Sequence, residues 1–324
     1  MIVIVAPEPK AAWLEPLIAA ADSPAVVLTF GRWRSLALRV AVRLWVRGAA
    51  DRRIRARLAV RRLADRMAAR RLPPAAAVVY APSFAARRTF AAAAARGGGT
   101  RLVLVEDLPW LRELHDDLDR AAARHPEAPF LQRFRAPARD LGRQEAEWVL
   151  AHQQLVFGHW ALQRRLHAGV PAEQVALCPW VAPTTPHGPV PALTGAPLVL
   201  LLAGTGAARS GLLEAVAAVR RLPGTRLLVR GGEALEPRWV LDEPGVRIST
   251  AQERATLEGV DAVLAPAWCE AYPDEVPLAA ANGIAVIATA RAGGVVDVAA
   301  CGTLVEPGDV DGLLAACRAL LDGS

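Results

Sequence analysis

The residues best placed to do chemistry follow two apolar runs in the second half of the chain. Glu270, Tyr272 and Pro273 come after the first run, and Gly293-Gly294 come after the second. A glycine pair in a loop and the first turn of a helix both present backbone N–H groups, which bind anions such as phosphate. Each feature alone is also ordinary loop sequence. Together they make this stretch the first candidate for a ligand site.

A strand, loop, helix and strand are predicted to position these residues. Ala262 to Ala265 and Ile284 to Ile287 are short apolar runs, as expected for strands buried on both faces. Between them, Val276 to Ala281 carries no charge and follows Asp274 and Glu275, which place acid at the positive end of a helix dipole. This order implies a parallel sheet with a right-handed crossover, in which ligands bind beyond the carboxyl ends of the strands.

A second glycine-containing loop follows the strand predicted from Pro197. Gly204 and Gly211 bracket this loop, and Arg209 is its only cation. Glycines at a turn from strand to helix are a general but weak signal of a phosphate loop. Arg230, in the next predicted strand, could supply a second counter-charge.

In this order the segments resemble the donor-binding half of family 4 glycosyltransferases, also called glycosyl transferases group 1. The similarity is carried by P-A-W-C-E-A-Y-P, N-G-I-A-V-I-A-T, A-G-G-V-V-D and G-T-L-V-E-P-G-D-V-D-G-L. It implies a GT-B fold, an α/β architecture of two doubly wound, Rossmann-like parallel-sheet domains facing a cleft. It also implies a retaining glycosyltransferase that takes a sugar from a nucleotide-sugar donor and passes it to a lipid-linked or saccharide acceptor.

The resemblance assigns roles to individual residues. Glu270 matches the first carboxylate of the family's E-x7-E motif, which faces the donor sugar. The helix start from Tyr272 to Val276 and the Gly293-Gly294 turn would lie toward the donor diphosphate, with Arg209 or Arg230 as counter-charges. These charges and helix dipoles would stabilise the leaving group, so we expect no metal and no cofactor apart from the nucleotide-sugar substrate.

Several positions depart from the family pattern. Leu278 stands where the second glutamate of E-x7-E binds the donor ribose, and Thr205 and Ser210 stand where two cations hold the diphosphate. The first strand leads into A-P-E-P-K, without the usual loop glycine. These departures support a second hypothesis, in which the chain is a catalytically silent glycosyltransferase-like protein that binds a partner or a ligand.

The first half, residues 1–182, is interpreted as the acceptor-side domain, and residues 183–324 as the nucleotide-sugar-binding domain. Glu106 and Asp107 follow the strand predicted from Arg101 to Val105, where many family members carry a histidine. A carboxylate there could orient an acceptor hydroxyl or take its proton. We predict instead that Asp107 caps a helix from Pro109 to Ala122, and leave the role of Glu106 open between cap and catalysis.

Predicted strands and helices alternate along the first half. The strands are expected at Met1 to Ala6, Ala25 to Phe30, Ala76 to Tyr80 and Arg101 to Val105, and a helix at Ser83 to Arg96. His115, His125 and His167 lie in charged segments and are expected to be solvated. A proline-rich connector, Val181 to Ala192, is the expected hinge between the domains.

Arginine is concentrated near the start of the chain. Residues 31–72 contain fourteen arginines against Asp51 and Asp65, a balance of +12 in a protein whose formal net charge is +6. The segments Arg32 to Arg47 and Asp51 to Arg71 are predicted helices. A basic helix face suits an anionic membrane surface, and it equally suits plain solvation. Nucleic acid ranks lower, because no base-stacking or groove-reading module is visible.

Other features limit localisation and partners. Four scattered cysteines without metal-ligand spacing fit reduced, mostly buried thiols. No apolar run is long enough to span a bilayer, and the first residues lack the basic start of a signal peptide. We therefore expect a cytoplasmic protein, with peripheral binding at the inner face of the membrane left open by the arginines. The family's closing helices have no counterpart after Val310 to Leu321, so a partner protein could replace them.

Overall fold

The computed structural model describes residues 1–6, 17–18, 25–29, 50–97, 99–126, 128, 136–178, 198–204, 208–230, 244–249, 257–269, 273, 275–292 and 302–322. At residues 29, 50–57, 208, 230, 247–249 and 322 it describes the backbone alone. The chain forms two compact units, called here the first and second unit. The first comprises Met1–Leu111, Arg135–Phe157 and Leu162–Trp180, and the second Arg112–Phe134, Gly158–Ala161 and Val181–Ser324. Two segments of the first half thus belong to the second unit.

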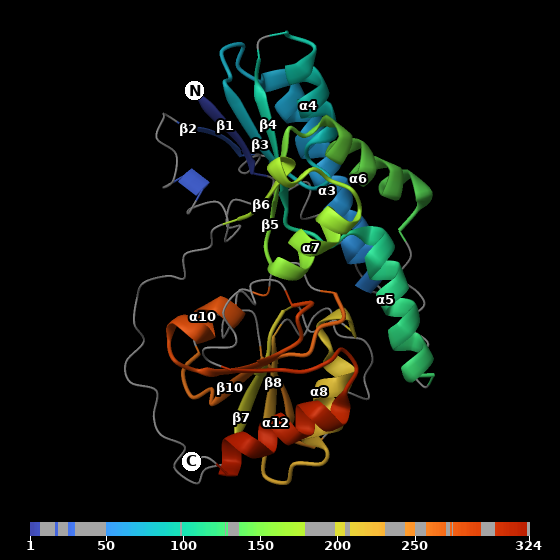
Figure 1. Ribbon diagram of the computed structural model, residues 1–324, viewed down its shortest axis with the longest axis vertical. Helices are drawn as coiled ribbons and strands as arrows, with labels where there is room; N and C mark the ends of the chain where they lie inside the picture. The colour runs from blue at the N-terminus through green and yellow to red at the C-terminus, as the bar shows by residue number, and fades with distance from the viewer. Residues whose placement is uncertain are drawn as a thin grey trace. The chain divides into compact units, whose positions relative to one another are not determined.

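The first unit contains a six-stranded parallel sheet in the order β2-β1-β3-β4-β5-β6 (Figure 1). Its strands are β1 (Ile2–Ala6), β2 (Ala25–Thr29), β3 (Val78–Pro82), β4 (Arg101–Glu106), β5 (Gln153–Val156) and β6 (Val175–Leu177). Its helical elements are α3 (Ala50–Arg71), α4 (Arg87–Ala94), α6 (Ala138–Leu150), α7 (His159–His167) and the 3-10 turn η2 (Ala172–Gln174). The first three residues of α7 group with the second unit.

Alternate strand residues build the core of the first unit. Val3, Val79 and Leu102 point to one face of the sheet, where they pack with Phe90 of α4 and Ala68 of α3. β-branched and other apolar side chains favour such doubly covered strands, because neither face meets water. The core therefore fixes α3 and α4 on the sheet.

The second unit contains a six-stranded parallel sheet in the order β12-β11-β10-β7-β8-β9. Its strands are β7 (Val199–Leu202), β8 (Arg226–Arg230), β9 (Val246–Ser249), β10 (Ala262–Ala265), β11 (Ala285–Ala288) and β12 (Gly302–Leu304). Its helical elements are the 3-10 turn η3 (Ala208–Ser210), α8 (Leu212–Val219), α10 (Glu275–Ala281), α12 (Val310–Asp322) and α5 (Leu111–Arg124), of which all but Leu111 groups here.

Helices cover both faces of this second sheet. Leu200 and Leu264 pack against α8 and α12 on one face, whereas Leu201 and Val263 pack against α10 on the other. The strand order reverses between β7 and β10, since β8 and β9 extend the sheet to one side of this pair and β11 and β12 to the other. In doubly wound sheets such a switch point is where ligands bind, beyond the carboxyl ends of the strands.

The two strands and the helix predicted around the candidate site are present, and β11 lies one residue later than the predicted strand from Ile284 to Ile287. β10 spans the predicted residues, and α10 begins one residue earlier than the apolar run. The helix predicted from Ser83 is wrong at its start, because Phe84 has a positive φ of 68° and α4 begins only at Arg87. The connector at 181–192 and the helix at 32–47 lie outside the described residues. No helix in the described part combines the length and hydropathy needed to cross a membrane.

Candidate site at the carboxyl ends of the second sheet

The loops after β7, β10 and β11 are tied together by hydrogen bonds. Ala203 donates its N–H to the carbonyl of Leu264 at 2.8 Å, and Thr289 donates its N–H to the carbonyl of Ala265 at 3.0 Å. The hydroxyl of Thr289, which is fully buried, donates to the carbonyl of Ala267 at 2.6 Å. These bonds continue the strand pairing past the strand ends and fix where each loop begins.

Gly204 and Glu275 join the loop after β7 to the start of α10. The backbone N–H of Gly204 donates to Oε2 of Glu275 at 3.0 Å, and Gly204 has a positive φ of 86°. Glycine adopts this conformation without the steric cost that a side chain would bring. Two residues that the sequence predicted near the donor are thus in contact. Pro273, also predicted here, is buried just before the helix, and its carbonyl accepts the N–H of Val276 at 3.1 Å.

Gly211 and Arg209 hold the other end of the same loop. Gly211 has a φ of 79°, and a Cβ at this position would collide with the carbonyl of Pro266. The carbonyl of Arg209 accepts the N–H of Trp268 at 2.8 Å and that of Cys269 at 3.3 Å. The Arg209 side chain is partly exposed. The loop after β10 is therefore clamped against the loop after β7, with an arginine at its surface.

The departures from the family pattern have structural explanations in this region. Leu278, which replaces a ribose-binding glutamate in the resemblance, is partly buried and packs against the α10 core cluster. Ser210, at the position of a family cation, is 1% exposed. Ser210 is thus buried and Leu278 is packed, and neither position provides a charge.

The remaining predicted donor residues are only partly described. The backbone of Arg230 ends β8 at the same edge of the sheet. Five further predicted residues lie outside the described residues, so their roles stay predictions: Glu270, Tyr272, Asp274, Gly293 and Gly294.

A buried polar group beside this edge was not predicted from the sequence. Oε1 of Glu214, a residue 1% exposed in α8, accepts the indole N–H of Trp268 at 2.7 Å and lies 3.0 Å from Nε2 of His125. The guanidinium of Arg124 lies 5.5 Å from the centre of the Trp268 ring. The expectation that His125 is solvated is therefore wrong, because this histidine has a buried carboxylate as a neighbour.

An ion pair of Arg291 was also not predicted from the sequence. Arg291 follows β11 and forms an ion pair with the buried Asp117 of α5, and its guanidinium lies 5.6 Å from the centre of the Trp160 ring. Burial raises the pKa of Asp117, and Arg291 opposes that rise. Partners this far apart in sequence, 174 residues for Asp117 and Arg291, leave no local pattern to recognise.

In the first unit, Glu106 is buried at the carboxyl end of β4. It forms an ion pair with Arg165, whose guanidinium lies 3.6 Å from the centre of the Trp148 ring and 5.4 Å from that of Trp110. Burial raises the pKa of Glu106, and the charge of Arg165 opposes the rise. Oε1 of Glu106 has no hydrogen-bond partner among the described residues. Glu106 is thus a buried, paired carboxylate with one oxygen unused.

The predicted capping role of Asp107 is wrong. Both carboxylate oxygens of Asp107 accept from Arg61, each at 2.7 Å. The N–H of Leu111, where α5 begins, donates instead to Oε1 of Gln144 at 3.0 Å. A bidentate arginine pair is stronger than a single cap bond, so Asp107 binds the arginine.

Carboxylates occupy the start of α4. Glu147 accepts the N–H groups of Phe84 at 2.6 Å and Arg87 at 3.1 Å, and Asp65 accepts those of Arg88 at 2.9 Å and Thr89 at 2.8 Å. Arg143 pairs with both acids. Helix N-termini attract anions, and here two internal carboxylates satisfy that attraction.

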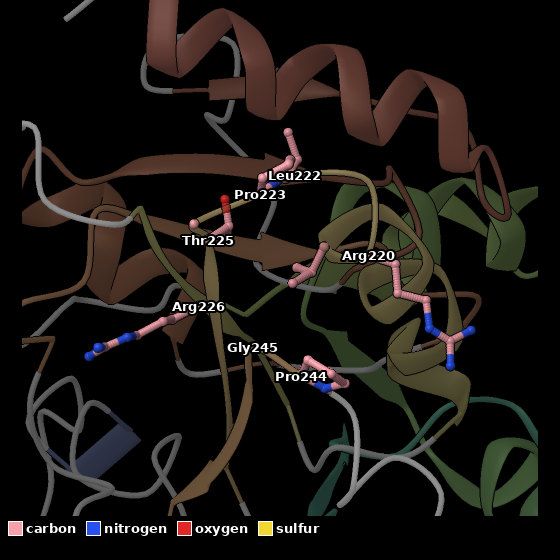
Figure 2. Close-up of a pocket in the computed structure, with 9 residues that line it drawn as sticks. Arg220, Leu222, Pro223, Thr225, Arg226, Pro244 and Gly245 are labelled. Atoms are coloured by element: carbon pink, nitrogen blue, oxygen red, sulfur yellow. The ribbon is translucent and has the colours of Figure 1, made fainter.

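A cavity of about 570 Å³ lies at the opposite edge of the second sheet (Figure 2). The turn from Val219 to Arg226 and Pro244-Gly245 line it, immediately before β8 and β9. In Figure 2 the side chains of Arg220 and Arg226 point away from each other rather than to a common centre. This cavity is therefore a poor fit to the predicted donor site, which belongs at the carboxyl ends.

Three of the four cysteines lie among the described residues. Cys178, Cys269 and Cys317 are free thiols, and burial raises the pKa values of Cys178 and Cys317 to about 11. The described residues contain no group of three or more histidine, cysteine, aspartate or glutamate side chains arranged to hold a metal ion.

The second half of the chain matches a known protein family. Residues 199–323 match the family described as Glycosyl transferases group 1. No curated protein matches the sequence significantly. The family match covers the strands, the loops and the helices that surround the candidate site.

Solved structures resemble almost the whole chain. The apo form of WaaB, a lipopolysaccharide outer core galactosyltransferase, is 13% identical with a TM-score of 0.60, over 100% of this chain and 91% of that one. Sucrose-phosphate synthase from Thermosynechococcus elongatus is 16% identical with a TM-score of 0.63, over 99% and 89%. HepE from Anabaena in complex with UDP is 15% identical with a TM-score of 0.61, over 99% and 89%. The predicted GT-B fold is thereby confirmed.

Proposed function

We propose that the chain transfers a sugar from a nucleotide-sugar donor to a saccharide or lipid-linked acceptor, with retention of the anomeric configuration, because residues 199–323 match the family Glycosyl transferases group 1. The proposal adds the mechanism, the donor and the acceptor class to the family assignment. The donor would bind at the carboxyl ends of β7 and β10.

One observation carries the proposal. The two loops at the switch point of the second sheet are fixed to one another, by Gly204 with Glu275 and by the carbonyl of Arg209 with Trp268 and Cys269. Enzymes gain rate from groups held in place before the substrate arrives, because those groups need not reorganise during the reaction. A rigid junction of two loops at a switch point suits a nucleotide diphosphate.

The roles follow the chemistry of the donor. Glu270 would face the sugar, the residues from Tyr272 to Glu275 and the Gly293-Gly294 turn would face the diphosphate, and Arg209 or Arg230 would offset its charge. Charge-assisted bonds from arginine to phosphate stabilise a leaving diphosphate without a metal ion.

Glu106 is proposed to act on the acceptor. Its unused oxygen could accept a hydrogen bond from an acceptor hydroxyl and orient it, while Arg165 holds the other oxygen. Burial raises the pKa of this carboxyl group, which favours its protonated form, and a protonated carboxyl can donate a proton as well as a hydrogen bond.

The second hypothesis, a catalytically silent ligand- or partner-binding protein, also has a supporting observation. Ser210 is buried and Leu278 is packed, neither is charged, and the carboxylate of Glu275 already accepts the N–H of Gly204. A donor diphosphate would meet one negative charge and few cations at this loop.

Nucleotide binding separates the two hypotheses. We would measure the melting temperature with UDP, GDP, ADP, CDP and dTDP, beginning with UDP because HepE is known in complex with it. A nucleotide at about a hundred times its dissociation constant stabilises the fold by about 2.7 kcal/mol. Arg209→Ala and Glu270→Ala test the site, and Arg226→Ala, at the opposite edge of the sheet, is the control.

The expected result is that one nucleotide raises the melting temperature and that Arg209→Ala abolishes the shift, while Arg226→Ala preserves it. Glu270→Ala should keep the shift with the bare nucleotide and lose hydrolysis of the matching nucleotide sugar, since Glu270 is assigned to the sugar. Indifference to all five nucleotides would favour the silent hypothesis.

A further inference from the structure

The described part of α3 and the residues up to the end of α4 separate positive from negative charge. Between Leu58 and Arg96 the sequence contains eight arginines and a single acidic residue, Asp65. Asp65 is fully buried, where it accepts the N–H groups at the start of α4 and an ion pair from Arg143. No exposed acid within this stretch offsets its exposed arginines.

Six of these arginines are exposed and are called here the basic seam: Arg66, Arg70, Arg71, Arg87, Arg88 and Arg96. The other two are used inside the first unit. Arg61 is 1% exposed and pairs with Asp107, and Arg62 pairs with Asp140 at 2.5 Å. The arginines are therefore of two kinds, and those of the basic seam are the exposed ones without an ion pair among the described residues.

Hydrogen bonds between the helices bring the basic seam together. Arg88 at the start of α4 donates its N–H to Asp65, the neighbour of Arg66, and Arg96 beyond the end of α4 donates to the carbonyl of Leu72, the neighbour of Arg71. The two helices thus run alongside one another, as Figure 1 shows. Arg66 and Arg70 are four residues apart and share one side of α3.

Within the described residues, no ion pair engages a guanidinium of the basic seam. Three carboxylates on these helices and on α6, Asp65, Asp140 and Glu147, are 0–3% exposed. Asp65 and Glu147 pair with Arg143, and Asp140 pairs with Arg62. Like charges held this close repel one another and cost stability. That cost is offset when the surface binds a polyanion.

We propose that the basic seam is a docking surface for an anionic phospholipid membrane. A membrane presents many phosphates over a broad area, which suits cations spread over two adjacent helices, and each such arginine strengthens adsorption about fivefold. Nucleic acid is less favoured, because no aromatic side chain on the described parts of α3 and α4 is exposed to stack on a base. Membrane binding does not depend on sugar transfer, because a catalytically silent protein could bind a membrane in the same way.

The test is co-sedimentation of the full chain with phosphatidylcholine vesicles that contain phosphatidylglycerol, compared with vesicles of phosphatidylcholine alone. The variant Arg66→Gln/Arg70→Gln removes two charges from the basic seam. Arg226→Gln/Arg318→Gln removes the same net charge from exposed positions of the second unit. Arg66→Lys/Arg70→Lys keeps the charge and should keep the binding, since adsorption depends on charge rather than on fork geometry.

We expect binding to the anionic vesicles alone, weakened about 25-fold in Arg66→Gln/Arg70→Gln and little changed in the other two variants. Equal loss in Arg226→Gln/Arg318→Gln would mean that net charge alone drives binding, and would overturn the proposal. So would absence of binding, with folding checked by melting temperature. Tighter binding of a short single-stranded RNA at the same salt, lost in the same variant, would assign the surface to nucleic acid instead.

Discussion

The backbone N–H of Gly204 donates a 3.0 Å hydrogen bond to the carboxylate of Glu275, across 71 residues of sequence. It joins the loop after β7 to the first turn of α10, at the point where the strand order of the second sheet reverses. The bond shapes the candidate donor site and also places a negative charge there. We therefore expect Glu275 to affect both the stability of the second unit and the affinity for an anionic ligand.

Glu275→Ala should lower stability. The variant leaves a partly buried N–H without its charged acceptor, which costs about 1–3 kcal/mol. Glu275→Gln retains an acceptor oxygen and should lose less. Urea denaturation of the three proteins measures the effect, and equal stability of the wild type and Glu275→Ala would contradict a structural role for this bond.

Gly211→Ala should lower the stability of the fold more than Gly224→Ala, which changes a glycine of similar φ. Gly211 and Gly224 have φ values of 79° and 76°, so each substitution costs about 1–2 kcal/mol from the backbone. At Gly211 the new Cβ also collides with the Pro266 carbonyl, whereas nothing lies within 4 Å of one at Gly224. Overpacking of this kind adds about 1–3 kcal/mol.

Comparing the melting temperatures of Gly211→Ala and Gly224→Ala separates the destabilisation caused by the collision with Pro266 from the cost of a positive φ, which both variants share. Similar losses in both would show that the loop after β10 moves aside freely. The clamp between the two loops would then be looser than the hydrogen bonds of Arg209 indicate.

The sequence was sufficient for features with a local pattern. The four residues from Ala262 to Ala265 are all apolar, so a buried strand needs no knowledge of its neighbours, and the structure has a strand over the same residues. The order of strands and helices then determined a doubly wound fold. The resemblance to group 1 glycosyltransferases could predict which loops form the candidate site for the same reason, since its motifs are contiguous.

Polar partners far apart in sequence were not predictable. Asp107 looked like a helix cap because a helix follows it, but Arg61, 46 residues earlier, binds both of its oxygens. His125 looked solvated because its neighbours are charged, but Glu214 lies 89 residues away and reaches it. Such pairs depend on packing between elements, which no short segment specifies.

Arg165→Met should destabilise the first unit strongly. It leaves Glu106 as a buried carboxylate without its counter-charge, a loss of about 3–5 kcal/mol. The double variant Glu106→Gln/Arg165→Met removes both charges and should recover much of that loss. Arg164→Met, at an exposed neighbouring position, should stay within about 0.5 kcal/mol of the wild type.

The measurement is a double-mutant cycle on the free energy of unfolding, with Glu106→Gln as the second single variant. Additive losses would mean that Arg165 and Glu106 do not depend on one another. Glu106 would then need another group to hold it in the proposed acceptor site.

Glu147 should make the stability of the first unit depend on pH. Burial raises its pKa from 4.5 to about 7, against the opposing effects of Arg143 and the N–H groups of Phe84 and Arg87. Between these two pH values the folded protein holds a proton that the unfolded chain has lost. The free energy of unfolding contributed by Glu147 is therefore fully present below pH 4.5 and falls as the pH rises to about 7, by on the order of 3 kcal/mol.

Glu147→Gln mimics the protonated side chain and should remove this slope. Urea denaturation at several pH values, followed through tryptophan fluorescence, gives the difference between the wild type and the variant, in which the titration of all other groups cancels. Glu145→Gln, on the same helix, is the control and should leave the slope unchanged. A difference that is constant from pH 5 to pH 7 would mean that the N–H donors at the start of α4 keep Glu147 ionised throughout, because they outweigh the effect of burial.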